Sequence, residues 1–169
     1  SSRLVGLFLM PLVTLVMLAL FLFVPTIDPL KANIAQFRGA FNSFIALIIG
    51  FMLYIHSLTL AWNLGYRNFE MSKAMLPFIG LLFIMIVFML RQAKRNWFIG
   101  IRTPWTLSSD HVWDETHRIG SFLFMTSGLL ALLGAFLNGT IAFWLMFVPL
   151  IGSSIFLVIY SYALYQREI

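Results

Sequence analysis

The sequence contains no cysteine and very few charged residues. The absence of cysteine excludes disulfides, thiolate nucleophiles and cysteine-ligated metal sites. Charged residues make up 10% of the 169 residues and hydrophobic residues 61%, whereas soluble domains carry about 25% charged and roughly 45–50% apolar residues. So few charges would not cover the surface of a soluble protein, so the composition predicts an integral membrane protein.

The net charge of +5 does not indicate a nucleic-acid-binding protein. The basic residues lie at the ends of apolar runs, where they interact with anionic lipid headgroups and set the membrane topology. Membrane lipids are therefore the expected partners of these residues, and we expect no direct contact with nucleic acid.

Apolar runs long enough to cross a bilayer, which takes about 20 residues, recur along the whole chain. The last one, between Ile119 and Gln166, is uncharged and too long for one span, and Asn138-Gly139 near its middle is a strong turn signal. The predicted fold is an all-α polytopic membrane bundle, a single membrane domain over 1–169. Its five spans lie at about 4–27, 40–62, 72–90, 118–137 and 140–165.

Within this frame, smaller features predict how the helices bend and pack. Pro11 and Pro149 are expected to bend their spans. The connection Ile27–Gly39 has apolar residues near a helical period and is expected to lie as an amphipathic turn at the headgroups. Ser127, Ala131 and Ala135 form a stripe of small residues that would let another helix approach closely.

The distribution of Lys and Arg predicts the orientation of the chain. One side would carry eight basic residues and the other three, which places the long loop at about 91–118 and the C-terminus in the cytoplasm. Ser1 would then lie outside, and we expect a sixth span upstream in the full protein. The eight are Lys31, Arg38, Arg91, Lys94, Arg95, Arg102, Arg118 and Arg167, and the three are Arg3, Arg67 and Lys73.

The long loop is where we expect function to lie, because it holds three of the five tryptophans and two of the three histidines. His111, Asp114 and His117 would be the ligands of a divalent metal, but steps of three drift around a helix and no zinc-protease pattern is present. Glu115 with His117 would act as a general acid and base, but no nucleophile accompanies them. We expect neither a metal nor a cofactor.

Two other interpretations of the loop stay open. It is either a docking surface, with Trp105 and Trp113 as anchors and Arg102 as the charged contact, or an interfacial segment whose polar groups satisfy one another. Arg102 is expected to form a bidentate pair with a carboxylate, which would make Arg102→Lys a damaging change. The candidate carboxylates are Asp110, Asp114 and Glu115. Arg95 is expected only to help hold the orientation.

Among the spans, His56 is the single ionisable residue away from the helix ends. An ionisable group inside a membrane is a functional candidate by default. Because Ser57 and Thr59 lie beside it, we expect a neutral, hydrogen-bonded histidine rather than part of a proton pathway.

The loop sequence NWFIGIRTPWTLSS, followed by V-W-x-x-T-H-R-I-G, resembles the signature of the SdpI family of bacterial membrane proteins. A second matching segment runs from Pro25 to Ile34, with Phe37 after it. The matching loop positions are Asn96, Gly100, Arg102, Thr103, Pro104, Trp105, Thr106, Trp113, Thr116, His117, Arg118 and Gly120.

This resemblance implies a membrane protein that gives immunity to a secreted toxic peptide. In some members it also implies signalling, through a cytoplasmic regulatory protein held at the membrane. It supplies no catalytic residue. The expected function is therefore a non-enzymatic immunity protein or signal receptor of the cytoplasmic membrane, with a small transporter or membrane enzyme as the alternative.

Overall fold

The computed structural model describes residues 3–168, and every regular element in that range is a helix. Five helices are long and apolar enough to cross a membrane, which confirms the predicted polytopic all-α fold. Ser1, which we expect on the outer side of the membrane, is not among the described residues. The elements are α1 (Arg3–Ile27), α2 (Lys31–Gln36), α3 (Arg38–Asn63), α4 (Met71–Gln92), α5 (Pro104–Ser108), α6 (Asp110–Gly134) and α7 (Gly139–Tyr165).

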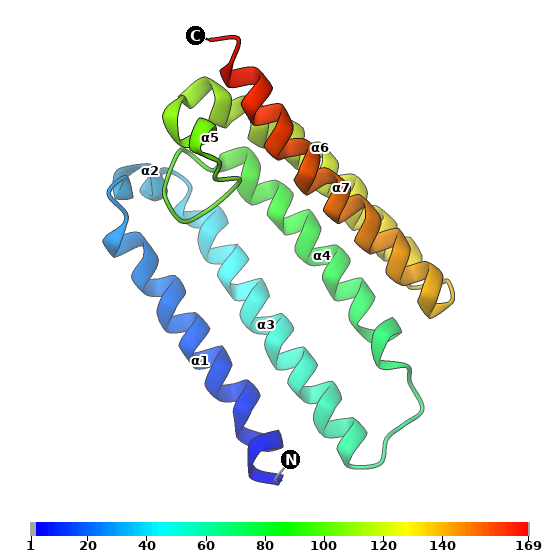
Figure 1. Ribbon diagram of the computed structural model, residues 1–169. Coiled ribbons are helices and arrows are strands. Elements are labelled where there is room, and N and C mark those ends of the chain that lie inside the picture. Colours follow the sequence, from blue (N-terminus) through cyan, green and yellow to red (C-terminus); the bar gives the residue numbers. More distant parts are fainter. Residues whose placement is uncertain (1–2, 169) are drawn as a thin grey trace.

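The long helices lie side by side in chain order, so that each packs on its neighbours in the row α1, α3, α4, α6, α7 (Figure 1). Because the row is open, α1 and α7 expose apolar faces along most of their length. Residues 4–27 of α1 and 139–165 of α7 include no charged residue, so these surfaces suit the hydrocarbon core of a bilayer.

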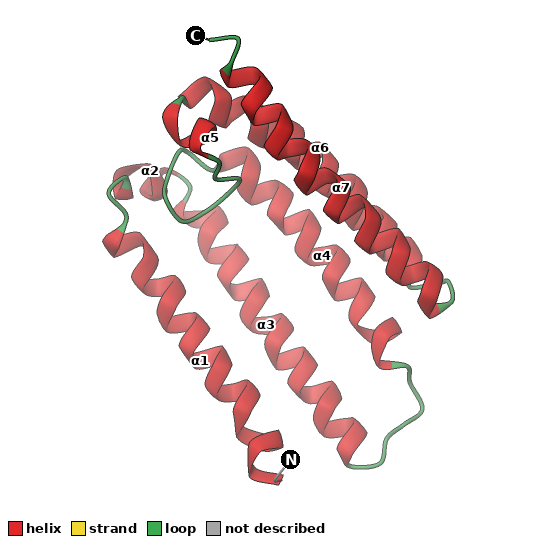
Figure 2. Cartoon of the chain, viewed as in Figure 1, coloured by secondary structure: helices red, strands yellow, loops and turns green. Residues whose placement is uncertain are grey.

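The two short helices and the long loop gather at one end of the row, where α7 also ends (Figures 1 and 2). The connection after α1 forms α2, and two of its four apolar side chains turn inward, although we expected an amphipathic turn with these side chains at the headgroups. Ile34 and Phe37 are 0% and 1% exposed because they enter a core shared by several helices and the loop. That core consists of Ile34, Phe37, Phe41, Ile45, Met89, Ala93, Ile99 and Trp113.

The fourth long helix begins at Asp110, two turns before the expected start near Arg118. The hydroxyl of Ser109 accepts a hydrogen bond from the amide of Val112 at 3.2 Å and so caps it. Because this segment is charged, we predicted that it belongs to the loop. In the structure its charged side chains Asp110, His111 and Asp114 lie on the exposed face of the helix, and Val112 and Trp113 on the other face are buried. The helix is therefore amphipathic at its start and apolar further on.

Two residues of the predicted stripe of small residues lie at a helix interface of α6, whereas Ala135 follows the end of this helix and is half-buried. Ser127 and Ala131 are both 0% exposed. Beside them α4 and α6 come so close that a Cβ on Gly128 would lie 3.2 Å from the carbonyl oxygen of Gly80. Small residues permit this approach, and the packing that results holds membrane helices together in place of the hydrophobic effect.

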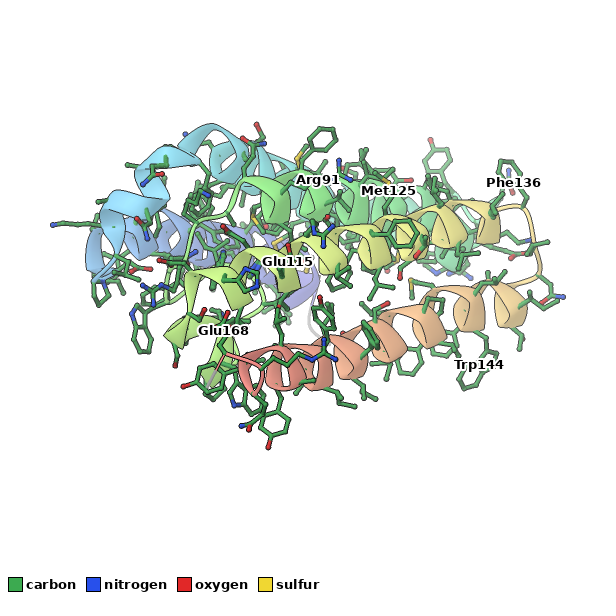
Figure 3. The ribbon with its side chains drawn as sticks, turned by 90° about the horizontal axis from the view of Figure 1, so that it is seen from above. Arg91, Glu115, Met125, Phe136, Trp144 and Glu168 are labelled. Carbon is green, nitrogen blue, oxygen red and sulfur yellow. The ribbon has the colours of Figure 1, made fainter. Side chains whose placement is uncertain are left out.

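The α6–α7 hairpin turns at Asn138-Gly139, which confirms the turn signal. The Oδ1 atom of Asn138 accepts a hydrogen bond from the amide of Ile141 at 2.9 Å, and this bond caps α7. Phe136 and Trp144, near this turn, lie at the opposite end of the molecule from Glu115 and Glu168 (Figure 3).

Candidate functional site

The long loop is shaped around Asn96, whose side chain is fully buried. Its Nδ2 donates to the carbonyl oxygens of Lys94 and Ile99, both at 2.9 Å. Its Oδ1 accepts from the amides of Phe98 and Ile99, at 2.9 and 2.6 Å. All four hydrogen bonds that an amide side chain offers here are formed, so Asn96 has a structural role and holds a tight backbone turn.

The segment after α1 is bound directly to this turn. Asp28, which is 2% exposed, accepts from the amide of Trp97 at 2.9 Å through Oδ2 and from the amide of Leu30 at 2.6 Å through Oδ1. Asn33 donates from Nδ2 to the carbonyl oxygen of Arg95 at 2.8 Å. The two segments that carry the family signature therefore meet in space.

Thr103 and Thr106 form a capping box that starts α5, with Pro104 in the first turn. The Thr106 hydroxyl also donates to the carbonyl oxygen of Ile101 at 2.8 Å. The Oγ atoms of Thr103 and Ser161 lie 3.0 Å apart, which links the loop to α7. Trp105, beside them, packs against Tyr162 of α7 with ring centroids 5.0 Å apart.

Trp113 and His117 hold the loop onto α6. The two rings stack with centroids 4.0 Å apart, and the indole Nε1 donates to the carbonyl oxygen of Ala93 at 2.8 Å. His117 Nδ1 lies 2.8 Å from the carbonyl oxygen of Trp113, and Nε2 accepts from the amide of Ile101 at 3.0 Å. One nitrogen donates and the other accepts, so the imidazole is neutral in this arrangement.

Gly100 makes the contact between the loop and His117 possible. Its φ of +111° is a conformation that side chains with a Cβ rarely adopt. A Cβ at this position would also collide with His117 Nε2. Glycine is therefore required here for two independent reasons, backbone conformation and space.

The predicted pairing of Arg102 with a carboxylate is wrong. Arg102 is exposed, and its Nη1 donates to the carbonyl oxygen of Trp97 at 2.9 Å. The three candidate carboxylates have other basic partners, because the start of α6 lies beside the end of α4 rather than beside Arg102. Asp110 Oδ1 lies 2.8 Å from Arg95 Nε, Asp114 lies 4.0 Å from Lys94, and Glu115 binds Arg118.

Arg95 does more than hold the orientation. Besides facing Asp110, its Nη1 donates to the carbonyl oxygen of Leu107 at 2.9 Å, which ties the start of the loop to the end of α5. From its position in the sequence, beside Arg91 and Lys94, we expected Arg95 only to help set the orientation of the chain in the membrane.

The metal and acid–base hypotheses both fail on geometry. His117 is buried and its two nitrogens bind backbone groups, while His111 is exposed and faces Glu168 at 3.9 Å. Asp114 pairs with Lys94, so these three residues do not converge, and among residues 3–168 no three His, Asp or Glu side chains could hold a metal ion. Glu115 is bound to Arg118 rather than to His117.

The docking interpretation loses one of its two predicted anchors. Trp113 is 1% exposed and therefore offers no contact surface, whereas Trp105 is half-buried against Tyr162. The exposed aromatic residues of the loop are Trp97 and Phe98, at 52% and 36%, with Arg102 beside them. Composition alone does not tell these tryptophans apart, because only tertiary contacts decide which ring is covered.

His56 does not have the hydrogen bond expected for it. Its Nδ1 is buried, and no polar atom in the part of the chain that the structure describes binds it. Neighbouring Ser57 and Thr59 instead donate to the carbonyl oxygens four residues before them, at 2.9 Å each. This is the usual arrangement of hydroxyl side chains inside a helix.

Sequence reasoning did not predict the long-range contacts of Asp28, Asn33 or Ser161. For Asp28 and Asn33 a signal existed, since both lie in the second segment that resembles the family. Ser161 lies in an uncharged apolar span, and nothing in its local sequence distinguishes it from other small residues of that helix.

Residues 92–161 match the model of the SdpI/YfhL protein family. The chain is also 28% identical over 168 residues to Immunity protein SdpI of Bacillus subtilis (strain 168). The aligned region covers 98% of this chain and 77% of the relative. These matches confirm the resemblance to the SdpI family. No solved structure matches the chain.

Proposed function

We propose that this chain is a non-enzymatic immunity protein of the cell membrane, which protects its cell from a secreted toxic peptide. The observation that carries the proposal is the similarity to Immunity protein SdpI over 98% of the chain. The similarity supports an immunity-type function at the level of the family. The five apolar helices agree with a multi-pass membrane protein.

Within this function, we assign the buried part of the signature to structure. Asn96, Thr103, Thr106, Trp113 and His117 are each 7% exposed or less. Their polar groups are occupied by backbone or neighbouring side chains. They hold the loop in one conformation, and a binding surface held in this way loses less entropy when a partner docks.

The docking surface is then the exposed aromatic face formed by Trp97, Phe98 and Arg102. Tryptophan and arginine are the residues that most often dominate binding energy at protein interfaces. The backbone beneath them is fixed by the bond from the Trp97 amide to Asp28 and by that from Arg102 to the Trp97 carbonyl. With the loop in the cytoplasm, as the basic residues indicate, its partner is a cytoplasmic regulatory protein that receives the immunity signal.

The test of the function is survival under toxin challenge. A susceptible bacterium with and without the chain is exposed to candidate secreted toxin peptides, with membrane levels of the protein measured by immunoblot. We expect one peptide at least to kill the empty cell at a dose that the expressing cell survives. Equal killing by all peptides, with the protein inserted in normal amount, would refute the immunity role.

The docking surface is tested separately with Trp97→Ala and Trp144→Ala as a matched pair. The two indoles are 52% and 54% exposed, but Trp144 lies near the other end of the molecule (Figure 3). We expect Trp97→Ala to abolish the response of the regulator at unchanged protein level and Trp144→Ala to leave it intact. If both variants signal normally, Trp97 is an interfacial membrane anchor and not a docking residue.

A further inference from the structure

A polar pocket of about 470 Å³ opens between the end of α4 and the first half of α6. This volume lies within the roughly 300–1,000 Å³ of typical ligand sites. Arg91, Lys94, Arg118 and Asp114 are among its lining residues, with His117 and Ser121 beneath them. Three cations therefore face one carboxylate.

The cations in this pocket are only partly neutralised. Lys94 Nζ lies 4.0 Å from Asp114, the limit of an ion pair, and Arg118 binds Glu115, which does not line the pocket. Arg91 has no carboxylate partner among residues 3–168. Its one polar contact there is a 3.4 Å hydrogen bond from Nε to the Ser121 hydroxyl. Its terminal nitrogens are thus free to bind an anion.

The other polar groups at the base of the pocket, His117 and Ser121, already bind protein atoms. Both nitrogens of His117 are engaged with backbone groups, so the ring adds no charge here. The Ser121 hydroxyl donates to the carbonyl oxygen of Arg118 at 2.7 Å. The side chains of Lys94 and Arg118 are 52% and 70% exposed, so the pocket is open at its mouth.

The position of the pocket indicates where the anion comes from. Arg91 occupies the last turn of α4, and it reaches from this helix towards α6 (Figure 3). It follows directly on the apolar run of a membrane span, at the depth where lipid headgroups lie. Basic pockets between membrane helices at this level bind the headgroups of anionic lipids.

We propose that this pocket binds the phosphate group of an anionic phospholipid, with Arg91 as its central ligand. A guanidinium offers two parallel hydrogen bonds to phosphate oxygens, and Lys94 and Arg118, which line the same pocket, add positive charge. Bound lipid bridges α4 and α6, the two helices that also meet at the Gly80–Gly128 crossing. The site does not depend on which face of the membrane the loop occupies, nor on the proposed immunity role.

The experiment measures thermal unfolding of the purified full chain in detergent with phosphatidylcholine, phosphatidylglycerol or inorganic phosphate added. We expect phosphatidylglycerol to raise the Tm by roughly 5 °C near saturation, relative to phosphatidylcholine. Arg91→Gln and Lys94→Gln should lose most of this rise. Arg67→Gln removes an exposed cation from the α3–α4 connection, at the opposite end, and should keep it.

The outcomes separate the possible sources of the phosphate. If inorganic phosphate gives the same rise, and Arg91→Gln abolishes it, the pocket is a phosphate site filled from solution and the lipid assignment is overturned. Should Arg91→Gln keep the full phosphatidylglycerol effect, the pocket itself is overturned. Lipid retention counted by native mass spectrometry gives a second readout for any variant of low basal stability.

Discussion

The carboxylate of Asp28 accepts a hydrogen bond from the backbone amide of Trp97 at 2.9 Å, across 69 residues of sequence. One oxygen closes the turn after α1, and the other holds the most exposed aromatic residue of the loop in place. The short α1–α3 connection therefore takes part in the candidate site, since it determines the backbone on which Trp97 and Arg102 are presented.

The first prediction follows from this bond. In Asp28→Asn, one acceptor oxygen becomes an NH2 donor that faces an amide donor, whichever way the side chain is oriented. We expect a loss of about 1–3 kcal/mol of unfolding free energy, measured as a lower Tm in detergent. Glu70→Gln, which alters an exposed ion pair with Lys73, is the control and should change little. An equal effect of the two variants would mean that Asp28 is dispensable to the loop.

Gly100 supports a second prediction, with Gly65 as a matched control. Both have positive φ, +111° and +99°, but a Cβ on Gly65 would meet nothing within 4 Å, whereas one on Gly100 would collide with His117. Gly65→Ala should therefore cost only backbone strain of about 1–3 kcal/mol. Gly100→Ala should cost clearly more, because it also displaces the acceptor of the Ile101 amide. Equal losses in unfolding experiments would contradict the loop–His117 contact.

The third prediction concerns the interface of α6. Ala131 is completely buried, so Ala131→Leu should destabilise the protein by about 1–3 kcal/mol through overpacking. Leu133→Ala on the same helix, at a side chain that is 59% exposed, should have little effect. Thermal unfolding in one detergent compares the two, and similar losses would show that the stripe does not pack against another helix.

The fourth prediction tests the orientation given by the basic residues. The chain has no cysteine, so single cysteines at the exposed positions Ser108 and Asn68 report on one side each. We expect an impermeant thiol reagent to label Asn68→Cys in intact cells, and to label Ser108→Cys only after the membrane is opened. The reverse labelling pattern would invert the topology.

Several features of the fold could be predicted from the sequence because they depend on short segments. The turn at Asn138 and the burial of the small residues Ser127 and Ala131 each follow from a local pattern. The family signature also includes several residues that hold the loop together, among them Asn96, Trp113 and His117. It did not tell which of them support the loop and which are exposed, since a buried and an exposed tryptophan have the same local pattern.

By itself, the sequence determined that this is a membrane protein with five apolar spans, because hydropathy and length are properties of each segment alone. Tertiary structure decided the rest. The partners of Asp110, Asp114 and Glu115 depend on how α4, the loop and α6 come together, and so does the burial of Trp113. The same holds for the contact of Asp28 with Trp97, because a hydrogen bond between residues far apart in sequence exists only once the helices between them have packed.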